Sequence, residues 1–190
     1  MIKKWLSAAN FLLLLALLFV LFFEVKGTWM LLEQGQQAIE FKYPLDYGEG
    51  PLLDQAVRLA AGENIYRRDL STPPFNIANY PPVYMLLQVP FVWIFGPALW
   101  YGRLISLLGV VLASFFTGLV VNALVHDRIA ALVSGLLLLS FPYVLHWSAL
   151  TRIDCLALAF LMAGLYVLVQ HGKSQRGKAW AVALLLLAAF

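Results

Sequence analysis

Long apolar runs alternate with short charged turns along this chain. A helix needs about 20 apolar residues to cross the hydrocarbon core of a bilayer. The pattern predicts four such helices and a fifth apolar run that covers only the last 12 residues. We place the spans at about residues 5–25, 102–125, 129–148, 153–170 and, incomplete, 179–190. We therefore expect an all-α, polytopic membrane protein in which residues 1–190 form one N-terminal transmembrane module of a longer chain.

The first apolar run begins like a signal peptide. Lys3 and Lys4 precede it, but Glu24-Val25-Lys26 follows it where a cleavable signal has small residues. We therefore interpret this run as an uncleaved first span.

The run at residues 83–95 is short and contains Pro90, so it either crosses the membrane or lies on its surface. If it crosses, the basic residues of the short loops divide four against four between the two sides; if it lies on the surface, they divide six against two. Cytoplasmic loops carry the excess of Lys and Arg, which favours the surface position. The N-terminus then lies in the cytoplasm, and a loop at residues 26–101 lies outside the cell membrane.

Composition supports a membrane protein and excludes other classes. The chain is 62% hydrophobic and 12% charged, with a mean hydropathy of +0.82, whereas soluble domains have roughly 25% charged residues. This excludes a water-soluble enzyme and a disordered chain, and the single Cys155 excludes an internal disulfide. The net charge is only +3 and its basic residues stand at the ends of the apolar runs, so we expect no nucleic-acid partner.

The outer loop holds most of the acidic residues: eight of the ten lie between Glu24 and Asp69. Within it, residues 46–50 form a turn, and an amphipathic helix is expected at residues 51–61 because Pro51 is a favoured first-turn residue. The carboxylates of Asp46 and Glu49 stand just before this helix. They either cap and solvate its N-terminus or perform chemistry there.

Other polar residues of the loop are weaker candidates. Arg67 and Arg68 either form a solvated charged run or bind an anionic phosphate. Tyr80 lies in a rigid Tyr-Pro-Pro segment and either anchors the chain at the membrane interface or stacks on a sugar.

Three charged residues stand at the ends of spans. Arg103 and Arg152 either extend towards the lipid headgroups or bind substrate. The side chain of Asp154 is too short to extend towards the headgroups. Asp154 therefore either caps its helix or acts in a site, with Arg152 as a nearby partner. Charges at membrane depth are costly and usually functional.

The order of these features resembles the GT-C membrane glycosyltransferases, in particular the dolichyl-phosphate-mannose mannosyltransferases and the lipid A aminoarabinose transferases. The segments that carry the resemblance are Asp46-Tyr47-Gly48-Glu49, Leu59-Ala60-Ala61-Gly62-Glu63, Tyr80-Pro81-Pro82-Val83-Tyr84, Gly102-Arg103-Leu104-Ile105-Ser106-Leu107-Leu108-Gly109 and Arg152-Ile153-Asp154. Tyr47 stands where the family often has glutamate, and either Glu49 or no residue replaces that carboxylate.

The resemblance implies a GT-C-like helical bundle that moves a sugar from a polyprenyl-phosphate donor at the outer membrane surface. It implies that Asp46 is a base or metal ligand, that Asp154 is the second acidic site and that Arg103 belongs to the donor site. The same two aspartates are candidates for holding Mg²⁺ or Mn²⁺. Arg152, Arg103 or the pair Arg67-Arg68 would neutralise the leaving phosphate.

Two other classes compete with this prediction. A non-catalytic subunit or transporter of polysaccharide assembly would carry ionisable residues in the middle of its spans, and these runs are apolar there. An enzyme like an O-antigen ligase or polymerase also acts at the outer face, but the early acidic loop favours the glycosyltransferase.

Overall fold

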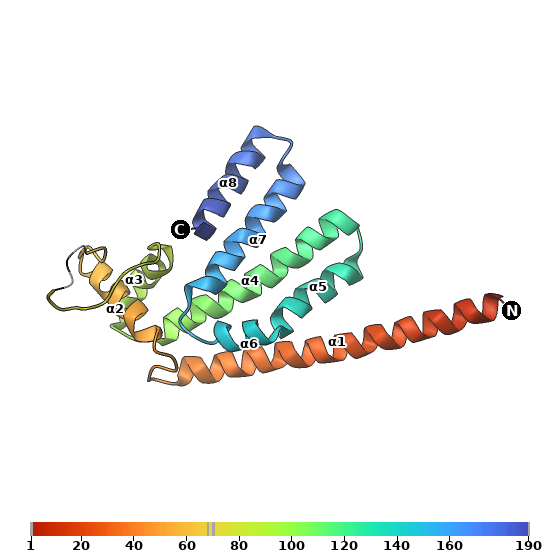
Figure 1. Ribbon diagram of the computed structural model, residues 1–190, viewed down its shortest axis with the longest axis horizontal. Helices are drawn as coiled ribbons and strands as arrows, with labels where there is room; N and C mark the ends of the chain where they lie inside the picture. The colour runs from red at the N-terminus through yellow and green to blue at the C-terminus, as the bar shows by residue number, and fades with distance from the viewer. Residues whose placement is uncertain (1, 68, 70, 190) are drawn as a thin grey trace.

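Eight helices make up the regular structure of the computed structural model, which describes residues 2–67, 69 and 71–189 (Figure 1). The described residues contain no strand, so the all-α class is confirmed. The helices are α1 (Ile2–Glu40), α2 (Glu49–Ala60), α3 (Val83–Phe95), α4 (Trp100–Val125), α5 (Arg128–Ser140), α6 (Pro142–Ser148), α7 (Ile153–His171) and α8 (Gln175–Ala189).

Three of these helices are long and apolar enough to cross a membrane, namely α4, α7 and the part of α1 from Asn10 to Glu40. The pair α5 and α6 makes a fourth span if the two are counted together. The protein is therefore polytopic. α3 has only 13 residues and falls short of a span.

Helix α1 continues about four turns beyond the expected span at residues 5–25, so the loop begins at Phe41 rather than at residue 26. Charged residues end an apolar run without ending a helix, and α1 keeps one face packed. Leu31 is 1% exposed and Ala38 4%. A Cβ built on Gly27 would lie 2.5 Å from the Cβ of Ser140, so this glycine lets α1 pack closely against the end of α5.

The expected span at residues 129–148 is broken into α5 and α6, which meet at an angle of 58°. Phe141 between them has an extended backbone, and Pro142 is the first residue of α6. Proline disfavours the helical conformation in the residue before it, so the sequence itself causes the break.

Helices α2 and α3 form a small unit at the end of the molecule where α1 ends and α4 begins (Figure 1). Leu52 and Ala56 of α2 share a buried cluster with Tyr84 and Met85 of α3. The indole nitrogen of Trp93 also donates to the carbonyl of Ala60 at 2.9 Å. The helix expected at residues 83–95 is present with those bounds, packed on α2.

Helices α4 and α7 approach closely because α4 has glycine at the contact. A Cβ built on Gly109 would lie 2.9 Å from the carbonyl carbon of Cys155, and one on Gly102 would lie 2.6 Å from Cγ2 of Thr151. A side chain at either position would push the helices apart. The two glycines thus hold the start of α4 against the turn that leads into α7, which is where the polar residues gather.

Candidate active site

A buried ion pair joins the start of α2 to the first turn of α4. Nε and Nη2 of Arg103 donate to the two carboxylate oxygens of Glu49 at 2.8 and 2.7 Å, and the side chains are 1% and 0% exposed. Nη1 of Arg103 donates to the carbonyls of Ala38 and Phe41, and Nη2 also donates to the carbonyl of Tyr43. All five N–H groups of the guanidinium are used, so Arg103 ties the end of α1 to α2 and α4.

Both carboxylate oxygens of Glu49 are likewise fully occupied by hydrogen bonds. Its oxygens also accept from the backbone N–H groups of Leu45 at 2.7 Å and Thr151 at 2.9 Å. Burial raises the pKa of Glu49, but the hydrogen bonds from Arg103, Thr151 and Leu45 outweigh burial, so the pKa lies below its ordinary value. The geometry therefore favours a positioning role over the catalytic role expected for Glu49 and the substrate contact expected for Arg103.

A second, partly exposed ion pair lies beside the first. Nη2 of Arg152 donates to Oδ2 of Asp46 at 2.7 Å, and both side chains are 15% exposed. Oδ2 of Asp46 also accepts from the backbone N–H of Gly48 at 2.9 Å. The guanidinium carbon of Arg152 lies 4.2 Å from the centre of the Trp147 ring and 5.8 Å from that of Tyr47. The fold thus brings together two charges that are far apart in the sequence.

The Asp46–Arg152 pair has polar atoms that form no hydrogen bond within the described residues. Among the described residues, Oδ1 of Asp46 and the buried Nε of Arg152 take part in no hydrogen bond. The backbone of Arg152 is fixed, because its N–H donates to the hydroxyl of Ser106 at 3.0 Å and its carbonyl accepts from that hydroxyl at 2.9 Å. The pair is therefore held in place, and Oδ1 of Asp46 and Nη1 of Arg152 are the groups without a hydrogen bond in the described residues that a ligand could meet, since Nε is enclosed.

Asp154 and Tyr80 line one cavity of about 230 Å³ between α7, α8 and the start of α3. Asp154 is exposed in the first turn of α7 and forms no ion pair within the described part of the chain. Arg152 is the residue before α7, so Asp46 and Asp154 lie at the same end of the helical bundle. No hydrogen bond joins the two described carboxylates.

Arg67, another arginine of the loop, contacts neither of these pairs within the described part of the chain. Arg67 donates to the carbonyls of Thr72, Pro73 and Pro74 and to the hydroxyl of Thr72. It therefore closes its own loop. Arg68, its expected partner in phosphate binding, lies outside the described residues.

The Mg²⁺ or Mn²⁺ ion that the resemblance implies between Asp46 and Asp154 stays a prediction. Mg²⁺ is usually held by one or two carboxylates together with substrate phosphates, and no group of three or more His, Cys, Asp or Glu side chains that could hold a metal occurs among the described residues. The guanidinium of Arg152 already occupies Oδ2 of Asp46 and balances its charge. No step below depends on a metal.

Four residues of this region are not among the site residues that the sequence indicates. The hydroxyl of Tyr84 donates to the carbonyl of Gly102 at 2.7 Å and lies 3.0 Å from the hydroxyl of Ser106. Thr151 offers its backbone N–H to Glu49 and Trp147 its ring face to Arg152. Their roles rest on backbone groups and contacts across helices, which residue types alone do not reveal.

The apolar helices and the charged cluster at one end of the bundle are those of a membrane glycosyltransferase of the GT-C type. Residues 79–190 match the family model for dolichyl-phosphate-mannose-protein mannosyltransferases, and since this is more than half of the chain, the chain belongs to that family. The match includes Arg103, Arg152 and Asp154 but begins after Asp46 and Glu49. No curated protein and no solved structure matches the chain significantly.

Proposed function

We propose that the protein transfers a sugar from a polyprenyl-phosphate donor to a lipid, glycan or protein acceptor at the outer face of the cell membrane. The observation that carries this proposal is the partly exposed Asp46–Arg152 pair, with its N–O distance of 2.7 Å. Transfer from a glycosyl phosphate needs both groups. The acceptor hydroxyl must lose a proton, and the leaving phosphate keeps a negative charge that needs a cation.

Asp46 is the general base in this proposal. Its Oδ1 is free of hydrogen bonds within the described part of the chain, while Oδ2 is held by Arg152 and Gly48. As the acceptor oxygen attacks the anomeric carbon, its proton passes to Oδ1. The bond between the anomeric carbon and the phosphate oxygen breaks, so one displacement inverts the configuration and releases polyprenyl phosphate.

Arg152 receives the leaving phosphate. Its Nη2 holds Asp46, and its Nη1 has no hydrogen bond within the described residues and is not among the enclosed atoms, so the side chain can bridge the base and the phosphate. Preorganised donors of this kind stabilise charge in the transition state more than in the ground state. The Glu49–Arg103 pair acts at a distance, by fixing the turn that carries Asp46.

Asp154 and Tyr80 are placed to contact the sugar. They line the same cavity of about 230 Å³ next to the residue that bears the guanidinium. A carboxylate that accepts from sugar hydroxyls and a phenol ring that lies against the sugar fit this position. The polyprenyl tail would stay in the bilayer beside the helices.

We also propose an orientation, with the N-terminus in the cytoplasm and the α2–α3 unit outside. Labelling of single cysteines tests it. Y47C, at a residue that is 88% exposed, is expected to react with a membrane-impermeant maleimide in intact cells. K173C, in the turn between α7 and α8, is expected to react only after the cells are opened. Reaction of K173C in intact cells would show instead that α3 crosses the membrane; native Cys155 is 7% exposed and gives little background.

The donor chemistry is tested in vesicles that contain the protein. Incubation with polyprenyl-monophosphate sugars is expected to release polyprenyl phosphate and glycosylate an acceptor. R152Q is expected to lower this rate by about 10²–10³-fold, the usual effect of removing a donor to developing charge. R152K retains the positive charge but lacks the planar guanidinium that binds phosphate through two parallel N–H groups. Its rate is expected to lie between those of the wild type and R152Q.

K42Q is the matched control, because Lys42 is an exposed cation of the same loop and is expected to leave the rate unchanged. Transfer from a lipid-diphosphate oligosaccharide but not from monophosphate sugars would assign the protein to the ligase or polymerase class. Full activity of R152Q would show that Arg152 does not bind the leaving phosphate.

A further inference from the structure

Helices α4 and α5 touch along a seam of small residues, at a distance from the site described above. The hydroxyl of Ser114 donates to the carbonyl of Gly135 at 2.8 Å. A Cβ built on Gly118 would lie 2.9 Å from the carbonyl oxygen of Ala131. Small residues at such contacts let two helices in a membrane approach closely.

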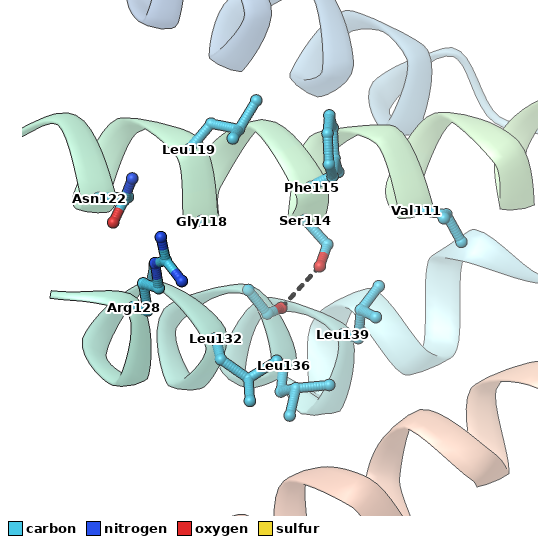
Figure 2. Close-up of a pocket in the computed structure, with 12 residues that line it drawn as sticks. Val111, Ser114, Phe115, Gly118, Leu119, Asn122, Arg128, Leu132, Leu136 and Leu139 are labelled. Carbon is cyan, nitrogen blue, oxygen red and sulfur yellow. Dashed lines mark hydrogen bonds between the residues drawn. The ribbon is translucent and has the colours of Figure 1, made fainter.

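Large apolar side chains rise on both sides of this seam and leave a groove of about 400 Å³ between them. Figure 2 shows the groove with α4 on one side and α5 on the other. Its walls are formed by Val111, Phe115, Leu119, Leu132, Leu136 and Leu139. Several of these side chains are open to the surroundings, with Phe115 59% and Leu132 58% exposed, so the groove faces the lipid.

One end of the groove is polar. Figure 2 shows Asn122 of α4 and Arg128 of α5 facing each other there. Arg128 takes part in no salt bridge of the described chain, and its neighbour Asp127 uses Oδ1 to accept from the backbone N–H groups of Ile129 and Ala130. A cation is disfavoured at the first residue of a helix, so Arg128 does not stand there to stabilise α5.

This polar end lies at the opposite membrane face from Asp46 and Arg152. Arg103, in the first turn of α4, belongs to the active-site end. Asn122 follows 19 residues later, which is about 28 Å along a helix and close to the thickness of the hydrocarbon core. Two basic residues, Lys173 in the turn after α7 and Arg176 in the first turn of α8, are at that same far end of α7.

We propose that the α4–α5 groove binds one phospholipid with an anionic headgroup from the leaflet opposite the active site. Its acyl chain lies along the apolar walls, and its phosphate accepts hydrogen bonds from Arg128 and Asn122. Charge complementarity selects this occupant, since the groove combines an apolar channel with an unpaired guanidinium at headgroup depth. The proposal depends only on the protein spanning a membrane and stands apart from the sugar-transfer chemistry.

Native mass spectrometry of the protein in detergent tests the site with palmitoyl-oleoyl phosphatidylglycerol (anionic) and palmitoyl-oleoyl phosphatidylcholine (zwitterionic) as probes. We expect the wild type to bind phosphatidylglycerol about tenfold more tightly, because both lipids offer a phosphate but the choline ammonium of phosphatidylcholine offsets its charge. R128Q is expected to abolish this preference. K173Q is the matched control, because it removes an exposed cation from the same membrane face and is expected to keep the preference.

A photoactivatable acyl chain on phosphatidylglycerol locates the lipid. Crosslinks are expected in the peptides that contain Phe115, Leu132 and Leu136, and L136W is expected to reduce them by filling the groove. Equal binding of the two lipids by the wild type, an equal loss in R128Q and K173Q, or crosslinks confined to other helices would each overturn the proposal.

Discussion

Replacing Glu49 with alanine is expected to destabilise the protein by about 3–5 kcal/mol, the usual effect of leaving one member of a buried ion pair without its partner. Arg103 would remain 1% exposed with no carboxylate beside it. The backbone N–H groups of Leu45 and Thr151 would lose their acceptor as well. Thermal unfolding of the purified protein in detergent, followed by circular dichroism, measures this effect.

The control is E63A, which removes the carboxylate of another ion pair. Glu63 accepts from Arg58 at 2.9 Å, but its side chain is 55% exposed. Arg58 is buried, but it also donates to the carbonyl of Asn64, and water can take the place of the exposed Glu63 carboxylate, so this variant is expected to lose less stability than E49A. An E49A protein as stable as E63A would mean that the buried pair does not hold the loop to the bundle.

The same pair gives stability a dependence on pH. The pKa of Glu49 is lower in the folded protein than in the unfolded chain, so its stabilising effect is complete above the ordinary pKa of glutamate, about 4.3. The effect is lost as the pH falls from there through the lowered pKa. Below about pH 4.3 the wild type is therefore expected to lose the advantage in stability that it holds over E49A at neutral pH.

Asp46→Asn is expected to lower the rate of sugar transfer by about 10²–10⁴-fold, the range that general bases contribute. The asparagine side chain has nearly the same shape and still offers an oxygen to Gly48 and Arg152, so we expect the protein to fold. The rate of polyprenyl phosphate release from a polyprenyl-monophosphate sugar measures the loss.

D54N serves as the matched control, because Asp54 is another carboxylate near the start of α2 and accepts only from Asn76 among the described residues. It is expected to retain activity. If D154N stops transfer while D46N does not, the base is Asp154, the exposed carboxylate of the neighbouring cavity. Normal turnover in both variants would falsify carboxylate catalysis at this end of the bundle.

The sequence predicts most of the helices but places some of their ends incorrectly. The runs at residues 102–125 and 153–170 correspond to α4 and α7, because a single apolar segment satisfies its backbone hydrogen bonds in a bilayer only as a helix. The helix at residues 83–95 was bounded correctly by Pro82 and Gly96. The sequence does not predict that α1 continues to Glu40. The last turns of α1 have a polar face and a packed face, and a count of charged residues does not distinguish such a helix from a loop.

The candidate residues differ in how well their types indicated a role. The cost of a charge at a span end indicates a role for Arg103, Arg152 and Asp154, whereas Asp46 and Glu49 are indicated by their position just before a helix N-terminus. Glu49 and Arg103 are nevertheless enclosed. A charge at a span end therefore indicates that it has a partner, and only the burial of the pair tells whether that partner is another residue or a substrate.

The sequence alone determined that this protein is helical, that it crosses a membrane and that eight of its ten acidic residues lie between Glu24 and Asp69. These properties follow from local composition, because the bilayer accepts only segments whose backbone bonds are satisfied internally. The tertiary structure decided how the charges pair. Asp46 meets Arg152 and Glu49 meets Arg103 because Gly102 and Gly109 let α4 pack closely against the turn before α7. That contact depends on shape across distant segments, which no local pattern contains.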